Sequence, residues 1–194
     1  MSELLESQVD PDPLRQFALW FDDARAAGVA MPESMAIATA TRDGRPSVRM
    51  VLLKGFDERG FTVFSNYESR KGRELDANPQ AALLFHRPGE QVRVEGRVER
   101  VPAEESDAYW ATRPVGSRRS AAASRQSRPI DSRAELEAAV AAVGPEPPRP
   151  PHWGGYLLVP EVFEFWTHRD DRLHDRLRYR RDGRGAWVVE RLSP

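Results

Sequence analysis

The chain has no cysteine and, among its 29 basic residues, only two lysines. Without cysteine it can form no disulfide, and it offers neither a thiolate ligand for a metal nor a thiol nucleophile. The four histidines are scattered and lack the paired spacing of a zinc site, so we expect no metal centre. Any redox chemistry must then come from a bound organic cofactor.

Long apolar runs are also missing. No stretch approaches the roughly 18 apolar residues that a membrane span needs, and the opening MSELLESQVDPDP lacks the basic and apolar regions of a signal peptide. We therefore expect a cytoplasmic protein. The net charge of −1 creates no overall field that would draw the protein to nucleic acid or to a membrane.

The length of 194 residues and the hydrophobic fraction of 40% are typical of one globular domain with a real core. We expect that domain at residues 12–194, after a flexible N-terminal tail at residues 1–11. A bias towards arginine explains the basic composition. The two exceptions, Lys54 and Lys71, stand out because a compact ammonium group makes phosphate or cofactor contacts that an arginine fork does not imitate.

The pattern of apolar and turn residues predicts a mainly β fold with peripheral helices. Asp12 as N-cap and Pro13 after it begin a predicted helix that ends before Gly28. About eight short antiparallel strands favour a barrel over a doubly wound sheet. Strands are expected at 35–41, 47–56, 61–66, 80–87 and 91–101 and in two hairpins after a Pro-rich connector at 145–153, and further helices at 69–77, 103–112 and 132–143. The Ser- and Arg-rich segment 113–131 is predicted to be a connection too polar for the core.

Basic and hydroxyl side chains gather at two places in the first half of the chain. Arg49 and Lys54 share one predicted strand five residues apart, so in a regular strand they leave opposite faces of the sheet. They serve different sites, or a bulge separates them, or they are two surface charges. The stretch SNYESRK at 65–71 places hydroxyls and cations where a helix begins, and free N–H groups there favour an anion. The alternative is a solvated first turn.

A second candidate anion site follows near Pro114. Tyr109, Arg113 and Ser117 are spaced four apart, and hydroxyls with a guanidinium group can cradle a phosphate. A disordered basic loop fits the composition equally well.

Near the end of the chain, alternation in a predicted strand places Arg172, His174 and Arg176 on one face, with Leu173 and Asp175 on the other. Two cations beside an imidazole repel one another unless something anionic or electron-rich lies over them. A solvated strand edge is the alternative.

Eight stretches resemble, in order and spacing, the pyridoxine 5′-phosphate oxidase family over residues 12–194. They read RMVLLK, SRKGREL, GEQVRVEG, YWATRPVGS, RQS, PPHWGGY, FEFW and RLHDR. The resemblance implies an antiparallel split β-barrel that binds flavin mononucleotide (FMN) and works as a homodimer with FMN in the interface.

The resemblance also implies roles for individual residues. The implied FMN site comprises Arg49, Met50, Lys54, Phe64, Ser65, Arg70, Lys71, Gln91, Gln126, Ser127, Trp166 and Arg176. The implied substrate site comprises Lys54, Tyr109, Arg113 and Ser117 around a phosphate, with Arg172, Leu173 and His174 at the pyridine ring. Arg172 and His174 are the implied catalytic residues.

The implied reaction oxidises pyridoxine 5′-phosphate or pyridoxamine 5′-phosphate to pyridoxal 5′-phosphate in vitamin B6 salvage or biosynthesis. Hydride passes from the substrate C4′ to the flavin, and dioxygen reoxidises the flavin to give hydrogen peroxide. The chain departs from the family pattern at 118–122 and 167–169. Two alternatives therefore stay open, namely a flavin oxidase of the same fold acting on a phenazine-like precursor and a non-catalytic flavin-binding barrel.

Overall fold

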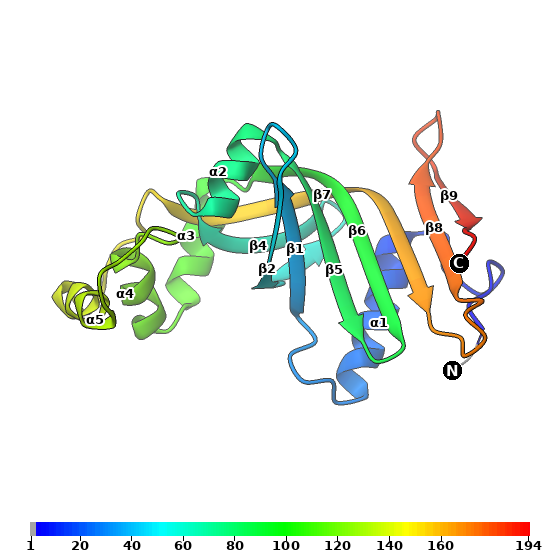
Figure 1. Cartoon of the computed structure of the whole chain (residues 1–194), viewed down its shortest axis with the longest axis horizontal. Coiled ribbons are helices and arrows are strands. Elements are labelled where there is room, and N and C mark those ends of the chain that lie inside the picture. Colours follow the sequence, from blue (N-terminus) through cyan, green and yellow to red (C-terminus); the bar gives the residue numbers. More distant parts are fainter. Residues whose placement is uncertain (1–2) are drawn as a thin grey trace.

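The computed structural model describes residues 3–194, and this part of the chain forms five helices and nine strands (Figure 1). In chain order they are α1 (Pro13–Ala26), β1 (Ser34–Ala40), β2 (Pro46–Leu52), β3 (Gly55–Asp57), β4 (Gly60–Asn66), α2 (Arg70–Ala77), β5 (Gln80–Arg87), β6 (Glu90–Arg100), α3 (Ala103–Thr112), α4 (Val115–Ala123), α5 (Arg133–Ala142), β7 (Trp153–Thr167), β8 (Asp175–Arg181) and β9 (Trp187–Arg191).

The strands form one sheet whose neighbours are all antiparallel. Seven of them follow the order β2-β1-β5-β6-β7-β4-β3, and β8 and β9 extend from β7. The sheet curls into an open half-barrel, with α3, α4 and α5 at one end of the molecule and β8 and β9 at the other (Figure 1). The predicted architecture, mainly antiparallel β with peripheral helices, is confirmed.

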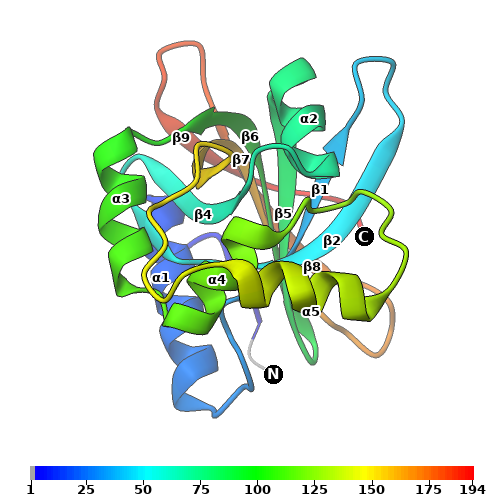
Figure 2. The ribbon, with the colours of Figure 1, turned by 90° about the vertical axis from the view of Figure 1, so that its left-hand side faces the viewer.

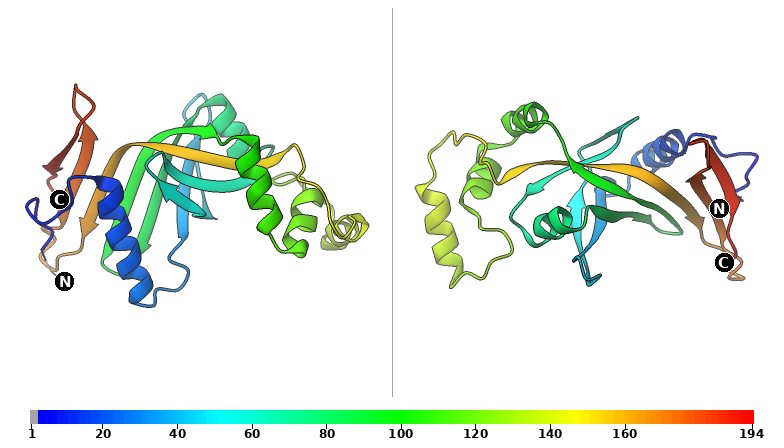
Figure 3. Two further views of the ribbon diagram at one scale, coloured as in Figure 1. Left: turned by 180° about the vertical axis from the view of Figure 1, so that it is seen from behind. Right: turned by 90° about the horizontal axis from the view of Figure 1, so that it is seen from above.

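The long strand β7 joins the two ends of the molecule (Figure 3). Two hairpins were expected in this region. The second is confirmed, since β8 and β9 follow one another and pair antiparallel. The first is wrong, because Pro160 lies inside β7 rather than at a turn. Opposite it, Glu95 pairs with Val162 and Gly96 pairs with Pro160, so Glu161 is the extra residue of a β-bulge. Proline has no N–H to donate and is tolerated at a bulge.

Two further predictions need correction. The expected strand 47–56 is interrupted after Leu52, and β3 begins at Gly55. The polar segment 113–131 contains the helix α4, whose Ala and Arg residues are good helix formers. The Arg119 guanidinium on α4 donates to two carbonyls of α5, those of Val140 and Ala141, and so ties the two helices together.

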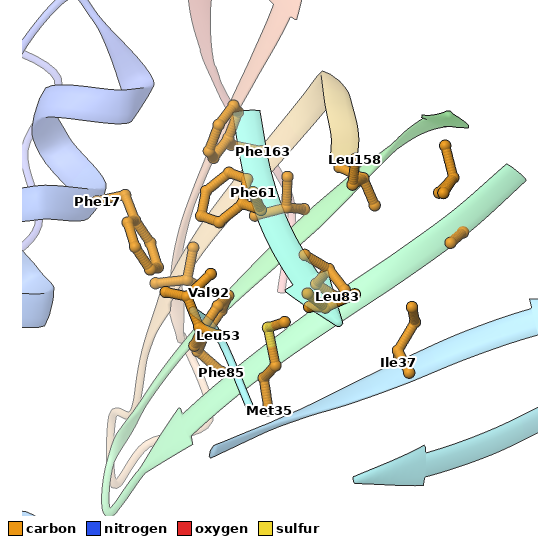
Figure 4. Close-up of a cluster of buried hydrophobic side chains, with 14 of the residues drawn as sticks. Phe17, Met35, Ile37, Leu53, Phe61, Leu83, Phe85, Val92, Leu158 and Phe163 are labelled. Atoms are coloured by element: carbon orange, nitrogen blue, oxygen red, sulfur yellow. The ribbon is translucent and has the colours of Figure 1, made fainter. Parts of the chain in front are cut away.

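The core lies between α1 and the inner face of the half-barrel. The α1 helix begins as predicted, with the Asp12 carboxylate accepting a hydrogen bond from the Leu14 N–H at 2.9 Å. Its Phe17 ring lies 4.8 Å from the rings of both Phe61 and Phe85, measured between centroids (Figure 4). These rings join one apolar cluster that includes Met35, Ile37, Leu83, Val94, Phe163, Phe165 and Tyr179.

Part of the segment expected to be a flexible tail lies against the end of the sheet. Residues 1–2 of that segment lie outside the described residues. Leu4 is buried, and its N–H donates to the Asp175 carboxylate while its carbonyl accepts from Arg191. Glu6 forms an ion pair with the same arginine at 2.8 Å. Within residues 3–194, none of the helices combines the length and apolar character needed to cross a bilayer.

The Phe17 packing predicts a large loss of stability on truncation. Because the ring is 1% exposed and surrounded by aromatic neighbours, Phe17→Ala should lower the free energy of unfolding by about 3–5 kcal/mol. Leu19→Ala is the matched control, since Leu19 lies on the same helix and is 57% exposed. Urea unfolding at one protein concentration measures both. Equal losses for the two variants would contradict this account of the core.

Candidate active site

A cleft of about 730 Å³ brings together many of the polar residues predicted from sequence. Strands β2 and β4 and the start of α2 supply part of its wall, and α3, α4 and the loop after α4 supply the rest. Figure 2 views the molecule from the end at which α3, α4 and α5 lie. The predicted residues that line the cleft are Arg49, Met50, Lys54, Phe64, Ser65, Arg70, Lys71, Tyr109, Arg113, Ser117, Gln126 and Ser127.

The break between β2 and β3 explains how Arg49 and Lys54 reach the same cleft. Arg49 lies within β2, where it pairs with Ile37 of β1. Lys54 follows the end of β2, and its N–H donates to the Thr62 carbonyl of β4. The alternation of a single strand is therefore interrupted between the two residues, and both line the cavity.

A buried carboxylate, Glu74 of α2, lies beneath two of the cleft's arginines. Its side chain is only 4% exposed and forms ion pairs with Arg49 at 3.3 Å and Arg70 at 2.9 Å. Hydroxyl groups of Thr39 and Ser47 donate to the same carboxylate, each at 2.5 Å. Burial opposes ionisation, but these hydrogen bonds together lower the pKa of Glu74 to about 2. Glu74 therefore stays charged and orients both guanidinium groups.

Lys71 is a buried cation one residue into α2. Its Nζ donates to Ser65 Oγ at 2.7 Å, Ser69 Oγ at 3.2 Å and Gln126 Oε1 at 2.9 Å. None of these acceptors carries a charge. Burial, followed by repulsion from Arg49, lowers the pKa of Lys71 to about 8. An anion bound in the cleft would restore the ammonium form.

The first turn of α2 is built to hold Lys71 in this position. Ser69 is fully buried as the N-cap, and its Oγ accepts from the Gly72 N–H. A Cβ at Gly72 would lie 1.9 Å from the Tyr67 carbonyl oxygen, so only glycine allows this close approach. Two basic residues follow the cap, and they oppose the helix dipole unless an anion lies nearby.

Arg113 is a second, half-buried cation, on the wall of the cleft that α3 and α4 supply. Its guanidinium lies 4.6 Å from the centroid of the Trp153 ring, and Nη1 is buried without a hydrogen-bond partner. Burial lowers its pKa. The Phe64 ring stacks on the Tyr109 ring, and the two ring centroids are 4.0 Å apart. A guanidinium group with a buried, unused donor is the expected partner of an anionic ligand.

The charges of the cleft are of one sign. Among the described residues that line it, none is acidic, and the basic ones are Arg49, Lys54, Arg70, Lys71 and Arg113. Glu74 lies behind two of them rather than in the lining. The cleft therefore suits ligands with more than one anionic group, with aromatic walls for a flat ring.

Three predicted residues form a separate row across the sheet. Gln91 of β6 pairs with Trp166 of β7, which pairs with Arg176 of β8. Arg176 forms an ion pair at 2.7 Å with Glu164, whose side chain is 4% exposed, and this hydrogen bond raises the pKa of Arg176. These residues do not line the cleft of their own chain.

The remaining predicted residues lie in the turn between β7 and β8. The strand expected at 172–176 begins only at Asp175, so the prediction that Arg172 and His174 share a strand face is wrong. Arg172 has a φ of +68°, which no regular strand contains. Leu173 is 66% exposed. The His174 ring lies 4.7 Å from the Trp166 ring, so this turn adjoins the row of Gln91, Trp166 and Arg176.

The departures from the family pattern at 118–122 have a clear place in the structure. Ser120 and Ala121 line a hollow of about 460 Å³ beside the cleft, and the two cavities share Arg113 and Ser117. Arg119 instead reaches α5. The small side chains of α4 thus leave additional space next to Arg113.

Sequence reasoning missed Glu74, Trp153 and Glu164. Glu74 carried a detectable signal, since it lies four residues after Arg70 on a predicted helix, a spacing that favours an ion pair. Glu164 did as well, because a carboxylate between Phe163 and Phe165 in an apolar strand requires a cationic neighbour. Trp153 gave no such signal, since its contact with Arg113 depends on the tertiary fold.

Comparison with known proteins shows which families match the sequence. Residues 21–145 match the family described as pyridoxamine 5′-phosphate oxidase, and residues 153–194 match the pyridoxine 5′-phosphate oxidase C-terminal dimerisation region. A pyridoxine/pyridoxamine 5′-phosphate oxidase from Bordetella petrii is 60% identical over 199 residues, which cover all of this chain and 94% of that protein. The enzyme of the same name from Burkholderia cenocepacia is 57% identical, with the same coverage.

Two solved structures share the fold. PhzG from Burkholderia lata 383, in complex with tetrahydrophenazine-1-carboxylic acid, superposes with a TM-score of 0.93 at 36% identity, covering 100% of this chain and 98% of that one. A pyridoxamine 5′-phosphate oxidase-related, FMN-binding protein from Nostoc punctiforme has a TM-score of 0.76 at 20% identity, covering 94% and 98%. With matches over nearly its whole length, the chain belongs to the pyridoxamine 5′-phosphate oxidase family.

Proposed function

We propose that this protein is an FMN-dependent oxidase that converts pyridoxine 5′-phosphate or pyridoxamine 5′-phosphate to pyridoxal 5′-phosphate. Dioxygen is the electron acceptor, and the reaction serves vitamin B6 salvage or biosynthesis. The observation that carries the proposal is the second cationic wall of the cleft, where Nη1 of the half-buried Arg113 is buried without a hydrogen-bond partner. A flavin carrier would need only the first wall, around Lys71.

FMN is the cofactor that family membership supports. The first wall fits its phosphate, since Lys71, Arg49 and Arg70 converge there without an acidic residue in the lining. Ser65 and Gln126 already contact the Lys71 ammonium and would extend the donor set. When bound, FMN accepts two electrons from the substrate and passes them to dioxygen, which becomes hydrogen peroxide.

A homodimer would complete the site. The C-terminal region at 153–194 matches a dimerisation region and contains Trp166, Arg172, His174 and Arg176. In the single chain these residues adjoin one another but not the cleft. We infer that the row of one protomer closes the cleft of its partner, with FMN between them.

The chain's own residues would then divide the work. Four cleft residues hold the substrate phosphate, and the buried Nη1 donor of Arg113 makes its charge-assisted bond strong. They are Arg113, Ser117, Tyr109 and Lys54. Arg172 and His174 contact the pyridine ring and orient the carbon that is oxidised. An alcohol substrate gives the aldehyde directly, whereas an amine gives an imine that water hydrolyses to the aldehyde and ammonia.

A phenazine-type oxidation is the second candidate. Its support is the close superposition on PhzG, together with the hollow beside Ser120 and Ala121 that leaves room for a larger ring system. The two candidate substrates differ in their need for Arg113 and Lys54. A phosphate group uses both cations, whereas a carboxylate on a ring needs fewer donors.

Purified protein loaded with FMN and incubated in air with pyridoxine 5′-phosphate or pyridoxamine 5′-phosphate should form pyridoxal 5′-phosphate and peroxide in equal amounts. The aldehyde is followed by its absorbance and peroxide by a coupled assay. Unphosphorylated pyridoxine is the control and should react poorly, because it cannot use the second cationic wall. If FMN-loaded protein oxidises neither phosphorylated substrate, the proposal is wrong.

Arg113→Ala should raise the KM for the phosphorylated substrate roughly 10- to 100-fold, because one charge-assisted hydrogen bond contributes about 1.5–3 kcal/mol. The FMN content should stay the same, since Lys71 and Arg49 lie on the other wall. Arg118→Ala is the matched control, as Arg118 belongs to α4 and does not line the cleft. Loss of FMN from the Arg113 variant would show that the two walls are wrongly assigned.

FMN affinity should weaken as pH rises above about 8. The pKa of Lys71 is lowered to about 8 in the ligand-free cleft, and a bound phosphate raises it again. Binding therefore has its full strength below pH 8 and falls by up to about tenfold per pH unit above it. Quenching of FMN fluorescence measures the affinity. Lys71→Arg, whose charge persists, should remove the inflection, and a flat profile for the unaltered protein would contradict the role given to Lys71.

A further inference from the structure

Arg169 makes several of the contacts within the turn between β7 and β8. Its backbone N–H donates to Nδ1 of His174 at 3.0 Å, and its carbonyl accepts from the Arg172 N–H at 3.1 Å. Its guanidinium donates to Oδ2 of Asp175 from Nε at 2.8 Å and from Nη2 at 2.5 Å. Arg169 thus contacts Arg172, His174 and Asp175, and the first two of these are the predicted catalytic pair.

The bond to His174 selects one form of the imidazole. A backbone N–H can only donate, so Nδ1 must be the acceptor, and the proton of the neutral ring lies on Nε2. Nε2 is then the atom available to a substrate. Without this bond, the ring is free to exchange its two neutral forms and to rotate.

The bond to Asp175 anchors the turn to the sheet. Asp175 is 9% exposed and begins β8, directly after His174. Arg191 of β9 donates to its other oxygen at 2.8 Å, and the Leu4 N–H donates to Oδ2 at 3.3 Å. Burial opposes its ionisation, but these contacts together lower the pKa of Asp175. The Arg169 side chain is therefore bonded to a carboxylate that Arg191 and Leu4 hold in place.

The backbone of Arg172 requires such support. Its φ of +68° lies in the left-handed region, which arginine rarely adopts. Strained backbone persists only where surrounding contacts enforce it, and it concentrates at functional sites. The bond from the Arg172 N–H to the Arg169 carbonyl is the contact that closes this turn.

We propose that Arg169 is a positioning residue, which holds His174 in its Nε2–H form and Arg172 in its left-handed conformation so that both face the substrate ring. The catalytic consequence rests on the proposed function, whereas the effect on His174 belongs to the chain alone.

Arg169→Ala keeps the backbone N–H and C=O that contact His174 and Arg172, and it removes the side-chain bonds to Asp175 that fix this backbone in place. It tests the proposal through two independent readouts. The first is the imidazole form of His174 in the ¹⁵N-histidine-labelled holoenzyme, measured by long-range ¹H–¹⁵N NMR and assigned with His174→Gln. The unaltered protein should show a single Nε2–H form, and Arg169→Ala a mixture of both forms. The second is kcat for pyridoxine 5′-phosphate, which should fall by about tenfold or more while KM and FMN affinity change little, because the phosphate walls are untouched. Arg184→Ala, at an exposed position of the β8–β9 hairpin, is the control.

Two results would overturn the inference. One is a His174 that keeps its Nε2–H form in Arg169→Ala together with an unchanged kcat, and the other is a mixed form in the unaltered protein. If Arg169→Ala fails to fold, Arg169→Gln, which keeps an N–H donor for Asp175, replaces it and should show a smaller shift in the same direction. Protein that oxidises neither substrate would refute the proposed function, and the NMR readout would still decide the role of Arg169.

Discussion

Mutual repulsion among cations in one cleft is the constraint on which the rest of the site depends. Arg49, Arg70 and Lys71 converge on one wall and Arg113 on the other, and a single buried carboxylate, Glu74, compensates part of that charge from behind. Burial and, after it, repulsion from Arg49 lower the pKa of Lys71, and Nη1 of Arg113 has no hydrogen-bond partner. An anionic ligand on each wall would relieve the repulsion, and this is the physical basis on which we propose a phosphorylated cofactor with a phosphorylated substrate.

The fold places the predicted site residues at two ends of one sheet. The cleft lies at the end covered by α3 and α4, whereas Trp166 and Arg176 lie on β7 and β8 at the other end (Figure 1). The bulge at Glu161 lets β7 continue through Pro160 and connect both ends. Under the proposed function, a single chain would present one half of each of two sites, an arrangement that a symmetric dimer completes.

Much of the fold was predictable because local signals agreed with the tertiary structure. Asp12 and Pro13 begin α1 as expected, and Ser69 caps α2. The errors arose where local and tertiary signals differ. Pro160 is normally read as a strand end, but a bulge accommodates it. The helix α4 lies in a Ser- and Arg-rich stretch that has no clear helical pattern. The turn at Arg172 has the alternating sequence of a strand. The cleft residues were predicted through family resemblance. Glu74 does not line the cleft but orients Arg49 and Arg70, and it was missed.

The most direct test of the two-wall account is a crystal structure of the dimer with FMN and pyridoxal 5′-phosphate bound together. The account predicts the FMN phosphate within hydrogen-bond distance of Lys71 and the pyridoxal phosphate group within hydrogen-bond distance of Arg113, with Trp166 of the partner subunit at the flavin. An FMN phosphate on Arg113, or a pyridoxal phosphate group outside the cleft, would contradict it.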